Sequence, residues 1–208
     1  MSEQQRSPKS RGYEMRKRAQ DVDRTRQRIV EAAVHLHGTA GPAATSIAAI
    51  AEHAGVTRLT VYRHFPDDTA LFAACSAHWL ARHTPPDPGE WARIADPGQR
   101  LATGLTDLYR HYREGEPMLT RIHRDQHTIP SAVRELHRAA FRRYVDTLTA
   151  AWPPPGDPVR DALVAHAAAF TTWRSLCHEQ HLTDQQAVHA MSTLVQTLGD
   201  APWVTEVP

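Results

Sequence analysis

The 208-residue sequence contains only two cysteines, Cys75 and Cys177. Two cysteines are too few for the disulfide framework of a small secreted domain and, by themselves, too few for a thiolate metal site. No apolar run approaches the length of a membrane-spanning helix, and the polar N-terminus lacks the hydrophobic segment of a signal peptide. These absences favour a soluble protein of the reducing cytoplasm that is not inserted in a membrane.

The sequence also lacks the motifs of common catalytic sites. It has no nucleophile elbow, no phosphate-binding glycine loop and no paired-carboxylate motif. A cysteine or serine near a histidine could in principle form a nucleophile pair, but the 14 histidines explain such proximity by abundance. We therefore predict that the protein is not an enzyme and has no cofactor.

Basic charge is unevenly distributed along the chain, although the net charge is only +1. Residues 1–83 carry 12 basic against 8 acidic residues, whereas residues 84–208 carry 12 against 15. Nine of the basic residues lie within the first 28 positions. We expect residues 1–22 to form a basic, disordered tail that is attracted to phosphate, the alternative being a solvated leader that only aids solubility.

Apolar residues recur at helical spacing throughout, with proline or glycine clusters between the segments, and no period-2 strand pattern is present. The fold class is therefore predicted to be all-α. We expect helices at about 23–39, 67–83, 98–113, 116–125, 131–152, 158–178 and 183–198, with a proline- and glycine-rich loop over 84–98, besides the short pair described next.

The segment 45–71 reads as two short helices around a tight turn, followed by a third. Ser46 can cap the first of them, and Gly55 can take the left-handed conformation that ends it. Thr57 is a natural N-cap for the next helix, 58–64, in which Val61 points inward. This layout is typical of a helix-turn-helix, whose second helix enters the major groove of DNA.

Residues of this segment and of the helix before it match a known signature. They are Arg26, Ile29, Ala32, Ala33, Gly41, Ile50, Ala51, Ala54, Gly55, Val56, Tyr62, His64, Phe65, Pro66, Ala70 and Leu71. Over about residues 24–72 the chain resembles the TetR family of transcriptional regulators. The resemblance implies a three-helix DNA-binding domain over 23–70 and a helical ligand-binding and dimerisation domain over 71–208.

The expected DNA contacts follow from side-chain chemistry and from the resemblance. Arg58 has forked donors that suit guanine, and Thr60 can offer its methyl or hydroxyl group to a base edge. Leu59 either contacts a thymine methyl group or is simply exposed. The resemblance implies phosphate contacts by Ser46, Thr57, Tyr62 and His64. The first helix is expected to clamp the DNA backbone through Arg24 and Arg28.

Two features depart from the family pattern. Asp67 and Asp68 stand where many members have a lysine, so we interpret them as capping residues of the following helix rather than as phosphate contacts. His37 occupies a position where the first helix usually has a large aromatic residue, and Gly38 follows it. We expect softer packing at this joint.

Two apolar stripes near the C-terminus are expected to mediate dimerisation. They comprise Val159, Leu163, His166, Phe170, Trp173 and Cys177, and Val188, Met191, Val195 and Leu198. The resemblance implies that these two helices pair with their copies as a four-helix bundle, which would present two recognition helices to a pseudo-palindromic operator. The alternative is that the stripes serve only the core of one chain.

The resemblance also implies a regulatory pocket, with candidate ligand-binding residues Trp79, Tyr109, Tyr112, Met118, His137, Phe170 and Trp173. Each of them can equally be an ordinary core residue. Cys177, His178 and His181 cluster without a clear fourth metal ligand, so no metal site is assigned.

We predict a homodimeric, ligand-responsive regulator that binds double-stranded DNA in a sequence-specific way and acts as a repressor. The alternatives are a DNA-binding dimer without an effector and a metal-responsive regulator.

Overall fold

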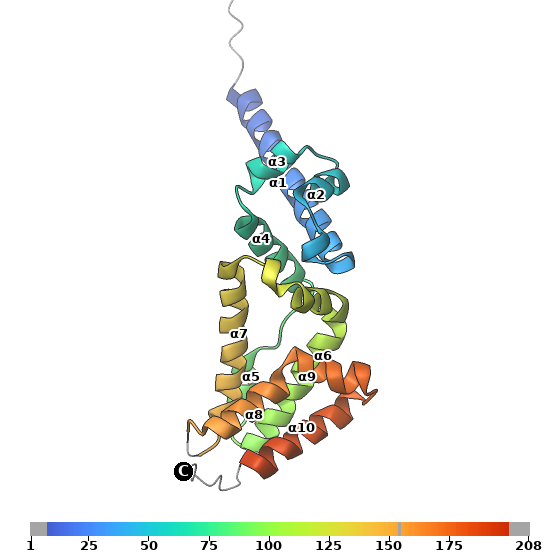
Figure 1. Ribbon diagram of the computed structural model, residues 1–208. Coiled ribbons are helices and arrows are strands. Elements are labelled where there is room, and N and C mark those ends of the chain that lie inside the picture. The colour runs from blue at the N-terminus through green and yellow to red at the C-terminus, as the bar shows by residue number, and fades with distance from the viewer. Residues whose placement is uncertain (1–7, 154, 200–208) are drawn as a thin grey trace, which may run out of the picture. The chain divides into compact units, whose positions relative to one another are not determined.

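The computed structural model describes residues 8–153 and 155–199 (Figure 1). These residues form helices joined by turns, with no β-strand within those two ranges, which confirms the all-α prediction. Across the same ranges, no helix combines the length and the apolar character that crossing a bilayer requires.

The chain folds into two compact units. Unit 1 comprises residues 8–79 and 121–130, and unit 2 comprises residues 80–120, 131–153 and 155–199, within the described chain. Each unit has its own cluster of buried apolar side chains. This division differs from the domain boundary expected after residue 70, since residues 71–79 and residues 121–130 both belong to unit 1.

Unit 1 is built from α1 (Pro8–Thr39), the 3₁₀ turn η1 (Pro42–Ala44), α2 (Ile47–Ala54), α3 (Arg58–His64) and α4 (Asp68–Leu80). Its core contains Ile29, Val30, Ala32, Ala33, Ile50, Ala51, Ala54, Val61, Phe65, Leu71 and Cys75. Helix α4 contributes Leu71 and Cys75 to this core, and it therefore belongs with the helix-turn-helix.

The first helix is longer than predicted. It was expected to begin near Asp23, but it begins at Pro8, so residues 8–22 are helical rather than the disordered tail that their composition suggested. Residues 1–7 of the predicted tail lie outside the described residues. Residues 8–22 include arginine, lysine, alanine and glutamine, which all favour helix. This local preference accounts for the longer helix without tertiary contacts.

Residues 121–125 bind the end of α1 through a set of polar contacts. Arg121 Nε donates to the Thr39 carbonyl (2.9 Å) and Arg124 Nη2 to the Ala40 carbonyl (2.9 Å). Asp125 accepts from Arg124 Nε (2.7 Å) and from the Ala43 amide (3.1 Å). The Arg124 guanidinium, aided by that amide, holds the pKa of Asp125 at about 2.

Gly41 lies at the centre of these contacts. Its φ of 96° is a conformation that favours glycine, and a Cβ atom there would overlap the Arg124 and Asp125 side chains. The orphan carbonyls at the C-terminus of α1 are therefore satisfied by a segment some 80 residues away in the chain.

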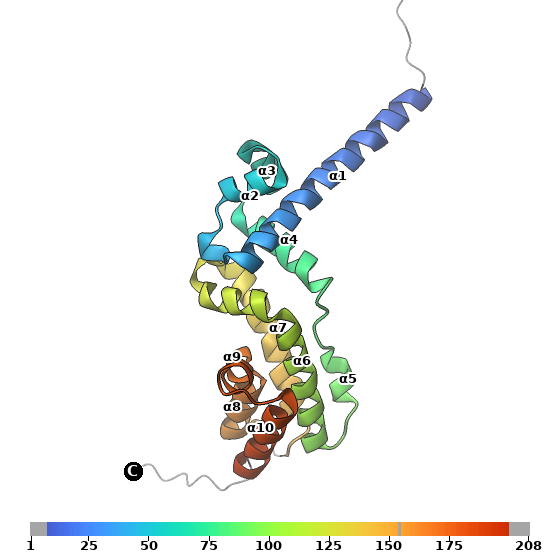
Figure 2. The same cartoon turned by 90° about the vertical axis from the view of Figure 1, so that its right-hand side faces the viewer.

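Unit 2 contains α5 (Pro88–Ala92), most of α6 (Pro97–Arg124), α7 (Ser131–Thr149), α8 (Pro158–Ala168), α9 (Phe170–Trp173), a π-helical turn (Arg174–Glu179) and α10 (Asp184–Gly199). The 3₁₀ turn η2 (Gln126–Thr128) belongs to unit 1. Helices α8 and α10 pack side by side (Figure 2). Trp91 of α5 is buried in the core and donates through Nε1 to Asp107 (2.9 Å).

Two of the helix predictions in this region were wrong. The predicted helices 98–113 and 116–125 form one continuous helix, α6, with Pro117 inside it. Conversely, the predicted helix 158–178 is broken at Ala169, whose backbone is extended (φ −72°, ψ 141°). In both places tertiary packing overrides local propensity. Helix α6 buries one long stripe of side chains, which favours a continuous helix through Pro117. The break at Ala169 lets the chain return to the core of unit 2.

Two buried tyrosines stabilise the break at Ala169. Tyr109 donates its hydroxyl to the Ala167 carbonyl and Tyr112 donates to the Ala168 carbonyl, each at 2.8 Å. These carbonyls precede the extended residue, where a helix can no longer supply amide donors. Burial raises the pKa of both phenols far above its usual value, which keeps them protonated as donors.

His37 fills the aromatic position of α1 as a buried, uncharged ring. Its imidazole is 4% exposed and stacks on Phe72 at 4.8 Å between ring centroids. Burial lowers the pKa of His37 from 6.5 to about 4.

We expect His37 to make the protein less stable in mild acid. Because its folded pKa lies below its unfolded value, stability is fully present above pH 6.5 and is lost as the pH falls toward 4. The difference in free energy of unfolding between the wild type and His37→Phe should therefore shift by up to about 3 kcal/mol across this window. Denaturant titrations at several pH values measure it, and parallel pH profiles for the two proteins would contradict the prediction.

Candidate nucleic-acid interface

The turn between α2 and α3 is closed by local capping, as the sequence predicted. The Ser46 hydroxyl accepts from the Ala49 amide (3.1 Å) at the start of α2. Gly55 ends this helix in the left-handed conformation (φ 63°), and the following Val56 amide bonds back to the Ala51 carbonyl (2.9 Å). The Ser46 hydroxyl proton is not used by this cap and can be donated to a phosphate.

Helix α3 begins at a second predicted cap. Thr57 Oγ1 accepts from the Thr60 amide (3.2 Å) and shares a hydrogen bond with the Thr60 hydroxyl (3.0 Å). The two hydroxyls together leave one proton available for an outside acceptor. Since either hydroxyl can donate in the bond between them, Thr60 can offer its methyl group or its hydroxyl proton to a base edge.

The inner and outer faces of α3 are as predicted. Val61 and the following Phe65 are buried at 0% and 2% exposure. Leu59 is 79% exposed, Tyr62 51% exposed, and Arg58 is also exposed. A short helix that presents a large apolar, an aromatic and a cationic side chain to solvent is poorly explained by folding alone and suits a binding surface.

Arg63 is a feature that the sequence analysis missed. It is exposed and lies on α3 at i+4 from Leu59, so it shares the outer face with the predicted contacts. That spacing was readable from the sequence. His64, in the same turn, is half-buried, and its pKa is lowered by this burial and by the neighbouring charges of Arg63 and Arg26.

The two arginines predicted to clamp the DNA backbone from α1 differ in their surroundings. Arg24 is exposed and makes only a long ion pair with Asp21 (3.8 Å). Arg28 instead uses Nη2 to donate to the carbonyls of Ala54 and, at 3.3 Å, Gly55. Arg28 thus ties α1 to the end of α2. Its expected contact with phosphate stays a prediction.

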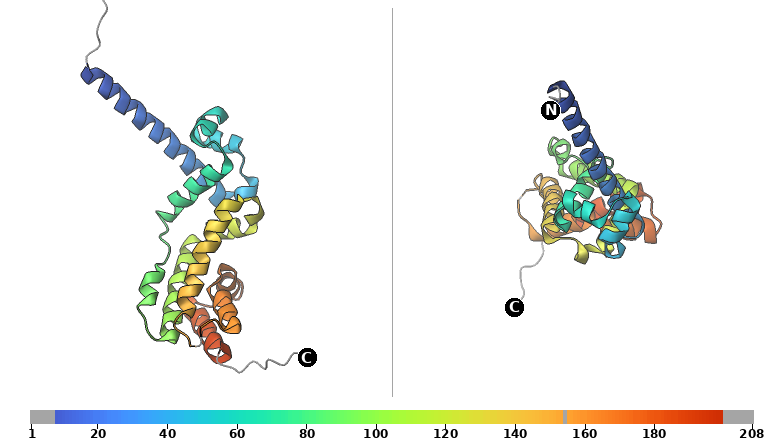
Figure 3. Two further views of the ribbon diagram at one scale, coloured as in Figure 1. Left: turned by 90° about the vertical axis from the view of Figure 1, so that its left-hand side faces the viewer. Right: turned by 90° about the horizontal axis from the view of Figure 1, so that it is seen from above.

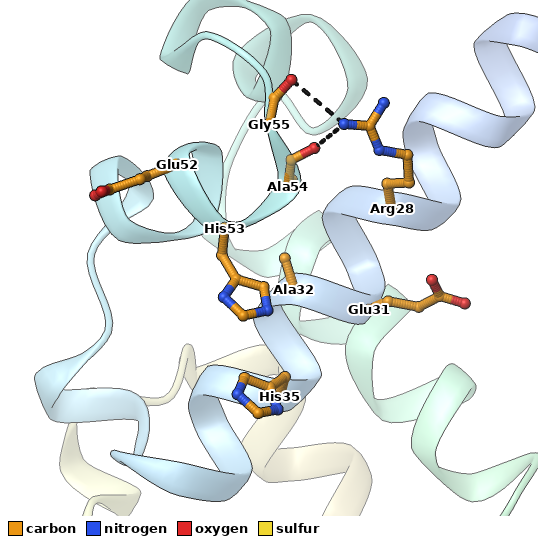
Figure 4. A pocket seen from close by; sticks show the side chains of 8 residues that line it. All are labelled: Arg28, Glu31, Ala32, His35, Glu52, His53, Ala54 and Gly55. Carbon is orange, nitrogen blue, oxygen red and sulfur yellow. Dashed lines mark hydrogen bonds between the residues drawn. The ribbon is translucent and has the colours of Figure 1, made fainter.

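Arg28 also borders an open pocket of about 490 Å³ between α1 and α2 (Figure 4). His35 and His53 stack there, with ring centroids 4.8 Å apart. Glu31 and Glu52 line the same pocket. Because two carboxylates repel phosphate, we do not assign this pocket to the nucleic-acid interface.

The acidic exit from α3 has the predicted capping role. Asp67 Oδ1 accepts from the Ala70 amide (2.7 Å), and Asp68 is the first residue of α4. Both carboxylates therefore lie at the N-terminus of α4, where negative charge is favourable.

The predicted ligand-binding residues are divided between the two units. Trp79 belongs to unit 1, whereas the other six belong to unit 2. Four of these six are buried in the core of unit 2: Tyr109, Tyr112, Phe170 and Trp173. Met118 is half-buried and His137 is exposed.

The contacts of the four buried residues are internal to unit 2. The tyrosines bind the carbonyls at the break in the chain, and Trp173 Nε1 donates to Asp184 Oδ1 (2.9 Å). Phe170 meets the Tyr112 ring edge-on at 5.5 Å. Each of the four side chains thus has a partner within unit 2.

The cluster near the C-terminal connection is not arranged as a metal site. His178 Nδ1 pairs with Glu116 Oε1 (2.9 Å), and Cys177 interacts with Asp184. Burial raises the pKa of the Cys177 thiol to about 11, which disfavours the thiolate that binds metals. In the described part of the chain, no group of three or more His, Cys, Asp or Glu side chains is placed to hold an ion.

The two C-terminal stripes contribute largely to the core of their own chain. Phe170, Trp173, Val188 and Val195 are buried there. The outer faces of α8 and α10 carry small and polar residues instead: Ala162, His166, Gln186, His189, Ala190 and Thr193.

Comparison with known proteins agrees with this geometry. Residues 29–75 match the family described as "Bacterial regulatory proteins, tetR family". Over 58 residues the chain is 43% identical to the HTH-type transcriptional regulator AcrR of Shigella flexneri, a match that covers 28% of this chain and 27% of that protein. The aligned region thus spans about a quarter of each.

Two solved structures share the fold. NalD, the secondary repressor of the MexAB-OprM multidrug efflux pump in Pseudomonas aeruginosa, superposes with a TM-score of 0.61 at 17% identity, covering 86% of this chain and 96% of that one. A TetR transcription regulator from Haloarcula marismortui gives a TM-score of 0.52 at 16% identity, covering 86% and 97%.

The capped α2–α3 pair and its core define unit 1 as a helix-turn-helix domain, joined here to an all-α second unit. Within this domain, residues 29–75 match the TetR family of bacterial transcriptional regulators.

The different surroundings of Arg24 and Arg28 predict different effects of substitution. Arg28→Gln should lower the free energy of unfolding by about 1 kcal/mol, because it removes charged hydrogen bonds to two carbonyls at a partly solvated site. Arg24→Gln, the matched control, should leave stability within about 0.5 kcal/mol of the wild type. Denaturant unfolding measures both, and equal stability of the two variants would contradict the structural role of the Arg28 hydrogen bonds.

Proposed function

We propose that this protein is a sequence-specific DNA-binding repressor in which α3 reads bases in the major groove. The observation that carries the proposal is the outer face of α3, where Arg58, Leu59 and Tyr62 are exposed on a helix whose two ends are fixed. In this proposal Arg58 makes paired hydrogen bonds to guanine, and Thr60 contacts a thymine methyl group.

The phosphate contacts in this proposal surround α3. Ser46 and Thr57 lie at the N-termini of α2 and α3, where backbone amides and the helix dipole favour an anion. Tyr62, His64 and Arg24 complete the set. Such contacts fix the position of α3 on the duplex, and the base contacts then select the sequence.

Repression as the direction of regulation is supported by one relative. NalD is a repressor, and its fold covers most of this chain. AcrR, which matches the DNA-binding region, is a transcriptional regulator. We therefore propose that operator binding by this protein lowers transcription.

We further propose that the protein acts as a homodimer through the outer faces of α8 and α10. These helices pack side by side and leave a surface of alanine, threonine, glutamine and histidine side chains. Small side chains allow the close approach of helices from two chains, and a two-fold axis requires the same face on both. The dimer would present two copies of α3 to one operator.

A small-molecule effector is also part of the proposal and rests on the family resemblance. Four of the predicted ligand-binding residues already contact other parts of unit 2: Tyr109, Tyr112, Phe170 and Trp173. In this proposal an effector therefore changes the packing of unit 2 and does not bind in a site lined by these four side chains alone. A ligand can change operator affinity only by binding two arrangements of the protein unequally. A regulator without an effector is the alternative.

Selection of bound sequences from random DNA tests the function directly. The wild type should enrich a pseudo-palindromic sequence whose half-sites are one helical turn or a multiple apart. Arg58→Ala should lose about 1–3 kcal/mol on that sequence and flatten the preference at one base pair per half-site.

Arg142→Ala removes an exposed arginine of α7 and should change neither result. Failure of the wild type to enrich any sequence would refute the proposed function. An equal loss for Arg58→Ala on selected and scrambled DNA would refute the role in base reading.

The dimer surface gives a separate prediction. Ala162→Arg and Ala190→Arg place a charge on the exposed faces of α8 and α10, and each should convert the protein to a 23.3 kDa monomer in light scattering. Loss of the second recognition helix should weaken operator binding by about 100-fold or more. Ala139→Arg, on the exposed face of α7, is the control and should leave a dimer. A wild type that is monomeric at micromolar concentration would contradict the proposal.

A further inference from the structure

The beginning of α1 projects away from the rest of unit 1. The views in Figures 2 and 3 agree that its N-terminal part continues past α2, α3 and α4 with none of these helices beside it. Residues 13–24 are accordingly all exposed, in contrast to Ile29, Val30 and Ala33 further along the same helix. We call residues 8–20 the α1 arm.

The α1 arm is strongly basic. It contains Lys9, Arg11, Arg16, Lys17 and Arg18 against the single acidic residue Glu14, which gives a net charge of +4 over 13 residues. Arg16, Lys17 and Arg18 are exposed. The rest of α1, residues 21–39, carries three basic and three acidic residues, so the positive charge excess of this helix lies in the arm, while the whole chain has a net charge of only +1.

The α1 arm is held in a fixed direction relative to α3. Both belong to the same compact unit, and α1 is one uninterrupted helix from Pro8 to Thr39. Ile29 shares the buried core with Val61 of α3. The Arg26 guanidinium lies over the Phe65 ring at 4.8 Å from its centroid. Docking of α3 in a groove therefore also decides where the arm lies.

We propose that the α1 arm binds the phosphates of DNA flanking the half-site read by α3. This inference rests on the proposed function and deepens it, because it adds a second DNA-contacting element that reads no bases. Thirteen helical residues span about 20 Å, and DNA carries one negative charge per about 1.7 Å of its axis. The arm thus meets several phosphates at once.

Charge placement favours a polyanion over a membrane surface as the partner. Arg16, Lys17 and Arg18 are consecutive, so they are distributed over about 200° of the helix circumference. The exposed apolar residues Tyr13 and Met15 lie on different sides of the helix, because positions two apart in the sequence are rotated by about 200° around the helix axis. A helix that lies in a membrane interface separates a basic face from an apolar one, and this arm does not.

The test uses the full-length protein and the triple variant Arg16→Gln, Lys17→Gln, Arg18→Gln. Glutamine has nearly the helix propensity of arginine and lysine, so the helix is retained while three charges are lost. On the selected operator with about ten additional base pairs on each side, the slope of log Kd against log salt concentration should become shallower by up to about 2.7, the value for three phosphate contacts. On a duplex that ends at the half-sites, the variant and the wild type should bind alike.

The matched control is Arg138→Gln, Arg142→Gln, Arg143→Gln, which removes three exposed arginines from α7. It has the same overall charge as the arm variant and should keep the wild-type slope on both duplexes. Equal slopes for the arm variant and the wild type on the long duplex would overturn the proposal. An equally reduced slope in the arm variant and the α7 variant would also overturn it, because the change would then result from the overall net charge and not from the arm.

This experiment distinguishes an error in the role of the α1 arm from an error in the proposed function. If the wild type binds the short operator specifically while the arm variant is unaffected on the long one, the arm assignment is wrong and the proposed function stands. If the wild type prefers no sequence, the proposed function is wrong. Loss of binding to vesicles of anionic lipid by the arm variant, with DNA binding unchanged, would replace DNA by a membrane as the partner.

Discussion

The rest of this structure depends on one constraint, which is that the backbone carbonyl and amide groups at helix ends must be hydrogen-bonded. A buried backbone carbonyl or amide without a partner costs about 1–3 kcal/mol, and every helix exposes several such groups at each end. Here side chains from distant parts of the chain satisfy many of them. Arg28 binds the end of α2, Arg121 and Arg124 bind the end of α1, and the hydroxyls of Tyr109 and Tyr112 bind the carbonyls before Ala169.

This constraint explains how so short a recognition helix can be positioned. Helix α3 has seven residues, too few to be stable in isolation. Its N-terminus is capped by Thr57, its inner face is buried through Val61 and Phe65, and the turn before it is fixed by Gly55 and Arg28. The outer residues, including Arg58 and Leu59, are consequently not needed for folding and can vary with the DNA sequence to be read.

In unit 2, side chains of the kinds that line ligand pockets form hydrogen bonds within the protein. Aromatic side chains with polar tips suit both purposes, since a hydroxyl or indole nitrogen must be bonded whether its partner is a ligand or the chain itself. The partners of Tyr109, Tyr112 and Trp173 are the break at Ala169 and Asp184. The hydroxyl and indole groups of these three side chains are therefore satisfied by the protein itself.

The sequence by itself determined the all-α class, the register of the helix-turn-helix, the caps Ser46, Thr57 and Asp67, and the left-handed Gly55. These features depend on residues within about four positions of one another, and local patterns report them directly. The tertiary structure alone decided that Arg28 binds carbonyls, that α6 continues through Pro117, that the chain breaks at Ala169 and that residues 121–130 join unit 1. Each of these outcomes requires a partner tens of residues away, as the bond between Ala43 and Asp125 does, and no local pattern identifies such a partner before the chain has folded.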